Sequence, residues 1–300
     1  MSATCLELIQ QATGEMGLAV PTSAVGNTNT DVVQQLALLN AVGYELIRKY
    51  QWQATSKLNT FQTEYLTTTG TVTNGSAIIT GIPDTSTLTT DYQAVWNGIL
   101  QNSFIASVDS PTQVTLNLEA QASGTAQAIT FSQVKYSMPS DYDRQIDRTH
   151  WDKTQHWMMI GPETAQQWEW LTSGYISTGP RVRYRIFGNK FQIWPPQGTQ
   201  HYLGFEYISK AWARSAADVA KNSFTVDTDT CIFPDRLMVC GLKHLYYQAK
   251  GFGDVFLPEY KAQESIAFAN DAGSQTLAMN PQITEVLISY NQIPDSSYGS

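Results

Sequence analysis

Apolar residues in the first sixty positions repeat at helical spacing. They follow one another at steps of three or four residues, or the sum of the two, and so share one helix face: Val32, Leu36, Leu39, Leu46 and Tyr50. Thr30 is the predicted N-cap, with Asp31 in the first turn. Because Gly43 costs about 1 kcal/mol against Ala inside such a helix, we expect close packing at that position to offset it. A shorter helix is predicted from Leu6 to Met16, ending at Gly17.

The period changes to two in residues 67–132. Val114, Leu116 and Leu118 alternate with polar residues, and Ile129 and Phe131 repeat the step. This segment contains no Lys or Arg, and 21 of its residues are Ser or Thr. Turn signals such as Asn-Gly and Pro-Asp separate its short runs. The pattern predicts an inserted module, an immunoglobulin-like β-sandwich.

Residues 133–226 mix both periods. The stretch from Asp143 to Trp170 is predicted to be helical, with a break at Gly161-Pro162. The strongest hairpin signal is 181–194, with Gly188-Asn189 as a two-residue turn. Pairing about that turn places Ile186 opposite Phe191 and Tyr184 opposite Ile193, and a further strand is predicted over 203–208.

The second face of this hairpin is polar and basic, and Trp194 stands opposite Arg183 for a possible cation–π contact. The candidate interface residues on it are Arg181, Arg183, Arg185, Lys190 and Trp194. Three interpretations remain open for them: salt bridges between subunits, contact with DNA phosphates, or simple solvation.

Helical pattern returns near the C-terminus. Pro234 and Gly251 bracket a helix over 235–250, and another begins near Pro258 and fades by Gly273. Residues 274–300 have too little apolar content to fold on themselves, so we expect an extended arm that docks on a partner. The apolar candidates for docking are Ile283, Val286, Leu287, Ile288 and Tyr290. The predicted class is therefore α+β, a helical-bundle core (1–66 and 133–273) with a β-hairpin, the insertion at 67–132 and the arm at 274–300.

Composition narrows the class of protein. The 300 residues carry 18 Lys and Arg against 26 Asp and Glu, and this net charge of −8 argues against a free-standing nucleic-acid binder. Three cysteines without CxxC spacing form no closed disulfide framework. No apolar run approaches the ~18 residues of a membrane span, and the N-terminus lacks the basic start of a secretion signal. We expect a soluble protein without a membrane anchor, made in a reducing cytoplasm.

The sequence offers little site chemistry. The four histidines show no metal-ligand spacing, and no nucleotide-binding or hydrolase-elbow motif occurs, so we predict no cofactor. Asp227-Thr228-Asp229, between a strand-like Phe224–Val226 and the helix after Pro234, fits a turn-and-cap role better than a metal site. The eight tryptophans fit core and interface anchoring better than a carbohydrate platform.

Several segments in a fixed order carry a family resemblance. They are YQWQ at 50–53, MPSDYDR at 138–144, GPET at 161–164, YRIFGNK at 184–190, FEYISK at 205–210 and FTVDTDTCIFP at 224–234. Outside 67–132, the chain resembles the head-to-tail connector (adaptor) proteins of short-tailed bacteriophages, which are related to the tail tubular proteins.

The resemblance implies a non-enzymatic virion protein, assembled in the host cytoplasm and located in the phage neck. It would form a ring, commonly of about twelve copies, joining the portal protein to the tail or nozzle protein and continuing the DNA channel. The C-terminal arm would reach the portal. Two alternatives remain: another tail or fibre-attachment protein, for which 67–132 docks a tail fibre or the host surface, and a glycan hydrolase using the tryptophans with Asp227 or Asp229.

Overall fold

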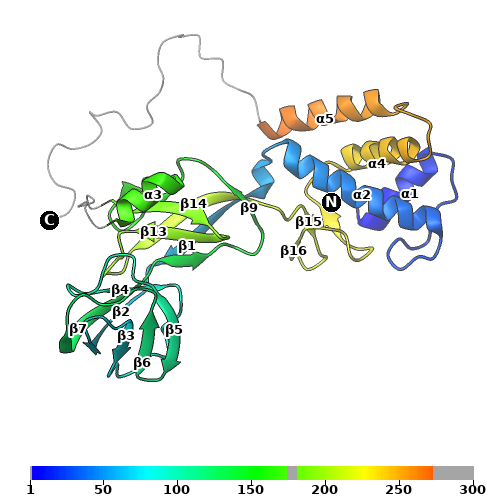
Figure 1. The fold of residues 1–300 in the computed structure, drawn as a ribbon. Coiled ribbons are helices and arrows are strands. Elements are labelled where there is room, and N and C mark those ends of the chain that lie inside the picture. Colours follow the sequence, from blue (N-terminus) through cyan, green and yellow to red (C-terminus); the bar gives the residue numbers. More distant parts are fainter. Residues whose placement is uncertain (1, 174–180, 273–300) are drawn as a thin grey trace, which may run out of the picture.

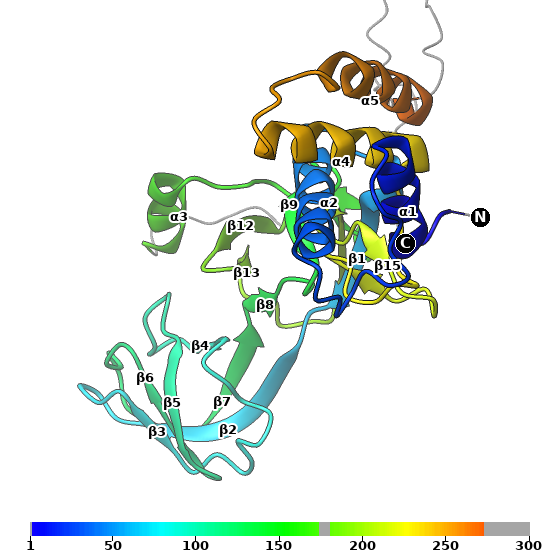
Figure 2. The same ribbon diagram turned by 90° about the vertical axis from the view of Figure 1, so that its right-hand side faces the viewer.

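The structure is a computed structural model, and it describes residues 2–173 and 181–272. Within these residues the chain is an elongated α+β molecule, with helices at one end and a β module at the other (Figures 1 and 2). Three large hydrophobic cores divide it into a helical body, a central pair of sheets and the inserted module, and a small fourth cluster lies under α3 (Ala165–Thr172). The predicted arm at 274–300 lies outside the described residues.

The helical body joins the two ends of the described chain. Its elements are α1 (Cys5–Glu15), α2 (Thr30–Lys49), α4 (Asp235–Ala249), α5 (Leu257–Ala272) and the short strands β15 (Ala213–Arg214), β16 (Ala220–Lys221) and β17 (Thr230–Cys231). The predicted helices are confirmed to within a residue or two at their ends. Asn29, one residue before the predicted Thr30, is the N-cap of α2, because its side chain accepts the N–H of Asp31.

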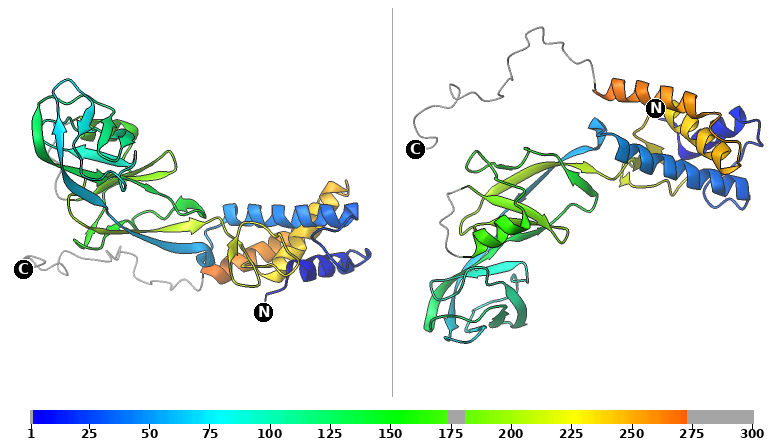
Figure 3. Two further views of the ribbon diagram at one scale, coloured as in Figure 1. Left: turned by 90° about the horizontal axis from the view of Figure 1, so that it is seen from below. Right: turned by 45° about the horizontal axis from the view of Figure 1, so that its top comes forward.

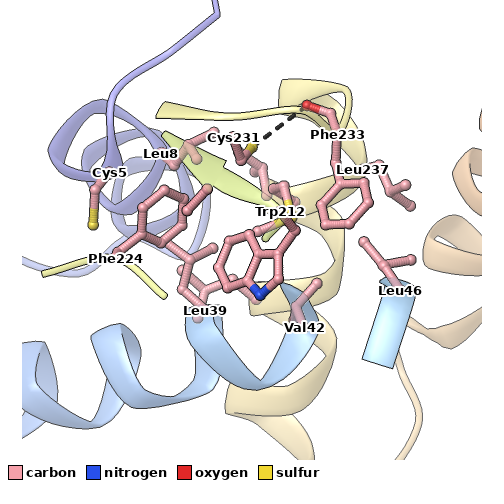
Figure 4. Packing of buried hydrophobic residues seen from close by; sticks show 14 of the residues in the cluster. Cys5, Leu8, Leu39, Val42, Leu46, Trp212, Phe224, Cys231, Phe233 and Leu237 are labelled. Carbon is pink, nitrogen blue, oxygen red and sulfur yellow. Dashed lines mark hydrogen bonds between the residues drawn. The ribbon is translucent and has the colours of Figure 1, made fainter. Parts of the chain in front are cut away.

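Trp212 lies at the centre of the body's core (Figure 4). Its ring is fully buried, edge-on to Phe224 at 4.9 Å and stacked on Phe233 at 6.0 Å between ring centroids. Gly43 lies against the same ring, and a Cβ there would come 2.4 Å from Trp212 Cζ2. The close packing predicted at Gly43 is therefore confirmed.

Two antiparallel sheets face each other in the centre. One contains β1 (Ser56–Gln62), β14 (Tyr202–Ser209), β10 (Trp151–Asp152), β11 (Trp157–Met158) and β9 (Tyr142–Gln145); the other contains β12 (Arg183–Phe187), β13 (Lys190–Trp194) and β8 (Lys135–Ser137). The predicted hairpin is confirmed in register, with Ile186 opposite Phe191 and Tyr184 opposite Ile193. The apolar side chains of both sheets form one core. We call this unit the central sandwich.

The helix predicted between Asp143 and Trp170 is wrong for most of its length. Three of the strands lie there, and only α3 (Ala165–Thr172) is helical, capped by Thr164. Long-range pairing with β14 recruits β9 and β10. Arg148 and His156 adopt left-handed backbone conformations that interrupt a helix, with φ of 63° and 58°.

The inserted module is one continuous sheet rather than the predicted two-sheet sandwich. Its strand order is β4 (Tyr92–Val95), β7 (Gly124–Gln133), β2 (Tyr65–Val72), β3 (Ile78–Thr80), β6 (Gln113–Leu116) and β5 (Ile105–Ser110). The outer strands β4 and β5 meet where Gln93 bridges Phe104 and Ala94 N–H donates to the Ser103 carbonyl at 2.9 Å. The six strands thus close on themselves, and we call this unit the barrel.

Local features explain why the sheet coils. Register shifts interrupt the β2–β7 and β5–β6 pairings, and such bulges increase twist. A Cβ at Gly70 would come 2.9 Å from side chains of both Ile79 and Ile129, so this glycine lets β2 bend over the core. The predicted alternation holds for Val114 and Leu116, but Leu118 follows the end of β6 and is exposed.

Candidate interaction surfaces

The arginine face of the β12–β13 hairpin is largely occupied within the chain. Arg183 donates to Glu163 Oε1 at 2.7 Å, and that carboxylate is almost fully buried. Arg185 donates to Gln192 Oε1 at 2.9 Å and lies 4.4 Å from the centre of the Trp168 ring. The hairpin therefore makes its cation–π contact between Arg185 and Trp168. The predicted contact of Arg183 with Trp194 is not made, and Arg183 pairs with Glu163 instead.

The remaining candidates on the hairpin differ in environment. Lys190 Nζ donates to Asp91 Oδ1 at 2.6 Å and thereby links the central sandwich to the barrel. Trp194 is buried against Trp168 and the neighbouring Leu171 of α3. Arg181 is exposed. Four of the five predicted interface residues thus support the chain's own fold, while contact with a second copy or with DNA stays a prediction.

Several exposed apolar side chains lie, among polar ones such as Glu206, on the outer side of the sheet formed by β1, β14, β10 and β11. Leu58 on β1 is 58% exposed, Tyr202 on β14 is 56% exposed, and Met158 on β11 lies opposite Trp151. A hollow of about 450 Å³ beside Leu58 and Trp151 is otherwise lined mainly by polar side chains, and the Lys153 side chain lies over Gly204. We call Leu58, Trp151, Met158 and Tyr202 the outer sheet face.

A second apolar surface lies at the end of the helical body farthest from the barrel (Figure 1). Leu18, from the segment after α1, lines a hollow of about 400 Å³ there together with Tyr247 of α4 and Phe252 of the following turn. Val20 and Val255 are exposed in the same two connecting segments. Phe252 and Val255 are 67% and 65% exposed there. We call this group the helix-end patch: Leu18, Val20, Tyr247, Phe252 and Val255. Exposed apolar groups of this kind mark interaction sites.

Neither surface was predicted from the sequence. Val20, Phe252 and Val255 fall between elements, where single apolar residues give no periodic signal. On the outer sheet face, Leu58 and Tyr202 belong to strands whose other faces are buried. Only the three-dimensional arrangement shows which face of these strands is buried in the core and which is exposed.

The Asp227–Asp229 turn ties distant parts of the helical body together. The Asp227 carboxylate accepts the Val25 N–H at 2.7 Å, while the Asp229 carboxylate accepts the Lys221 ammonium at 2.8 Å and two backbone N–H groups. The Asp229 carbonyl accepts the first N–H of α1, from Cys5, at 2.7 Å. The turn-and-cap interpretation is confirmed. The strand-like assignment of Phe224–Val226 is wrong, because those residues wrap around the Asp229 side chain.

A buried hydrogen-bond chain lies beside the outer sheet face. His201 Nδ1 is 2.6 Å from Asp152 Oδ2, and His201 Nε2 is 3.0 Å from Thr199 Oγ1. This order of hydroxyl, imidazole and carboxylate is that of hydrolytic triads. Here Asp152 also caps the turn at Thr154, and Thr63 accepts the His201 N–H. The chain therefore holds the β13–β14 loop, the β10 turn and the end of β1 together.

A second histidine is part of the core. His150 is 1% exposed and stacks on Tyr184 with ring centroids 4.1 Å apart, with Nδ1 3.0 Å from the Tyr184 hydroxyl. Burial lowers the pKa of His150 to about 4. The imidazole is therefore neutral near pH 7 and acts as an aromatic core residue.

Buried charge in the helical body is also paired. Lys243, on α4 and 4% exposed, donates to Glu15 at 2.7 Å and to Glu259 at 3.0 Å. It joins α1, α4 and α5. Within residues 2–173 and 181–272, no group of three or more His, Cys, Asp or Glu side chains is placed to hold a metal ion. No described helix is long and apolar enough to cross a membrane.

Compared with known proteins, the chain matches no protein-family model, and no curated protein is significantly similar to it. Its geometry therefore has to indicate the function. Apart from the exposed Arg181, the described ionisable groups discussed above serve the fold. The outer sheet face and the helix-end patch carry exposed apolar side chains.

Proposed function

We propose that this protein is a structural subunit of the head-to-tail connector of a short-tailed bacteriophage. It would form a ring, commonly of about twelve copies, between the portal and the tail or nozzle protein, and genomic DNA would pass through the ring. The protein would act by shape and binding, without catalysis. It would be assembled in the host cytoplasm and carried in the virion.

The placement of the resemblance segments carries this proposal. These segments are scattered over 50–234, yet all of them fall in the helical body and the central sandwich or in the links of those two units, and none falls in the barrel. Segment 50–53 joins α2 to β1, segment 184–190 forms the hairpin, and segment 224–234 leads into α4. The part of the chain that resembles connectors is thus a continuous structural unit, to which the barrel is added.

The uncovered surfaces support a ring. The helix-end patch and the outer sheet face lie on different units of an elongated chain, as contacts to two different neighbours require in a cyclic assembly. Aromatic and aliphatic groups in such patches typically anchor interfaces. The net charge of −8 suits a channel that lets DNA slide without gripping it.

Electron microscopy of the purified protein, alone and with its portal, tests the proposal. We expect rings that stack on the portal. Phe252→Ser combined with Val255→Ser should weaken assembly, whereas Val108→Ser, an exposed substitution on the barrel, should leave it intact. Persistent monomers of the unmodified chain without portal affinity contradict the proposal. Truncation at Gly273 tests the arm, since it should weaken portal attachment and leave the body folded.

A fibre-attachment protein is the second candidate, and the barrel favours it. This unit has its own core and is carried on β2 and β7, where Thr67 and Thr130 lie opposite each other with their hydroxyl oxygens 3.0 Å apart. Replacing residues 68–129 by Asn-Gly closes the two strands with a tight turn. A connector without its barrel should still join the portal, whereas a fibre-docking protein should lose its partner.

A further inference from the structure

Strand β1 is an unpaired edge of the central sandwich. All seven of its residues pair with β14 on one side. In the described part of the chain no strand pairs with its other side, and no backbone hydrogen bond is made there. An open strand of this length is a template for a further strand, and proteins usually cover or charge such edges. The one charge on β1, Lys57, is turned to Asp141 at 2.6 Å.

The described chain ends beside the start of this edge. The Asp271 carboxylate, in the last turn of α5, accepts the Gln53 N–H at 3.0 Å. One turn earlier, Phe268 stacks on Tyr50 with ring centroids 4.5 Å apart. Figures 1 and 3 show the end of α5 next to the segment that joins α2 to β1. The polypeptide after Ala272 therefore leaves the body close to Ser56, the first residue of β1.

We propose that residues 283–290 of the same chain add to β1 as a parallel strand. Residues 273–282 separate them from α5, and these ten residues can span about 33 Å, more than the roughly 20 Å length of β1. The occupant is thus within reach without help from another copy. The proposal concerns the free protein, before the arm docks on any partner.

The sequence of the segment fits the edge on both faces. ITEVLISY at 283–290 is rich in β-branched and aromatic residues and contains no Pro or Gly. In a parallel register that places its only charge, Glu285, beside Lys57, Val286 lies next to Leu58. Leu58 is the exposed member of the outer sheet face on β1. Main-chain bonds would hold the added strand, and alternate side chains would cover apolar surface on each face.

Disulfide cross-linking in the full-length protein tests this placement. Leu58→Cys with Val286→Cys should form a bond within one chain at least about tenfold faster than Leu58→Cys with Ser297→Cys, because strand pairing raises the local concentration of one thiol at the other. The three native cysteines are buried, so they compete little. Equal rates for the two pairs, or cross-links between chains only, overturn the proposal.

Hydrogen exchange gives an independent readout. In the unmodified protein the β1 amides that point away from β14 should be protected. The combined substitution Val286→Pro and Ile288→Pro removes two donors, and exchange at those amides should become about tenfold faster or more. Ser297→Pro is the matched control and should change nothing. Fast exchange in the unmodified chain, or no response to the prolines, contradicts strand addition. Because these experiments use the isolated subunit, their failure leaves the connector proposal standing.

Discussion

Gly43 on α2 offers a sharp test of the helical core. Substitution by Ala would normally stabilise a helix interior by up to about 1 kcal/mol. Here the added Cβ would lie 2.4–2.5 Å from three atoms of the Trp212 ring. Since Phe224 and Phe233 enclose that ring, it cannot move aside without displacing the core. Overpacking of this kind costs about 1–3 kcal/mol or more.

We therefore expect Gly43→Ala to lower the free energy of unfolding by a net amount of about 1–2 kcal/mol. Urea unfolding followed by helical circular dichroism measures this as a lower midpoint. Gly14→Ala in α1 is the matched control, because nothing lies within 4 Å of its Cβ, and it should raise stability by about 0.5 kcal/mol.

A double variant makes the reasoning specific. Trp212→Phe destabilises the core by itself, yet it frees the space that the new methyl group needs. The cost of Gly43→Ala should therefore be smaller in the Trp212→Phe background, a coupling that a double-mutant cycle measures. If Gly43→Ala is as stable as Gly14→Ala, or if the two core substitutions are simply additive, the packing argument is refuted.

Three further predictions concern buried polar groups. The pKa of His150 is about 4 in the folded state and about 6.5 unfolded, so the unfolded chain takes up the proton first as the pH falls. The free energy of unfolding should therefore fall by about 2 kcal/mol from pH 6.5 to 5. In His150→Phe this pH dependence should be weaker, and an unchanged pH dependence excludes the assignment. Lys243→Met removes a buried ammonium from two partly exposed carboxylates, Glu15 and Glu259, which keep Arg236 as a partner. It should cost about 1–3 kcal/mol in chemical denaturation, whereas the exposed Lys261→Met should cost under about 1 kcal/mol. Asp229→Asn removes the charge that pairs with Lys221, so it should lower the free energy of unfolding by about 1–3 kcal/mol. A lower melting temperature measures this loss. Loss of a polysaccharide hydrolase activity in a fully stable Asp229→Asn protein supports the enzyme alternative instead.

Sequence reasoning succeeded where the signal is local. The apolar stripe of α2 and the bracket of Pro234 and Gly251 around α4 depend on residues within a few turns of each other. The hairpin register likewise follows from one two-residue turn, because the turn fixes which residues face each other. The hairpin has its predicted register, and the apolar faces predicted for these elements are buried in the structure.

It failed where a distant strand decides the conformation. Residues around Trp151 alternate in no clear way, and β14, some fifty residues later in the chain, imposes extended structure on them. The closure of the barrel likewise depends on the contact of Gln93 and Ala94 with Ser103 and Phe104, ten residues further along the chain. Candidate site residues were misread for a related reason. The sequence does not show that Arg183 pairs with Glu163 or that Arg185 stacks on Trp168, so both arginines were predicted to be available for an interface.

The links between the three units determine whether the subunit can act by shape. Two strands carry the barrel, and its Asp91 reinforces this link: the carboxylate accepts Lys190, and the carbonyl accepts the Val134 N–H at 3.0 Å. On the other side, Asp141 lies where β9 and β14 meet the helical body. Although burial alone would raise its pKa, hydrogen bonds from Lys57, Ser209 and Tyr207 lower the pKa of Asp141 to about 2. The Lys190–Asp91 pair therefore fixes the barrel to the central sandwich, while Asp141 ties β1, β9 and β14 together within the sandwich, close to where the chain leaves for the helical body. A rigid segment of a tube requires such a fixed link, and an enzyme that opens and closes around a substrate does not.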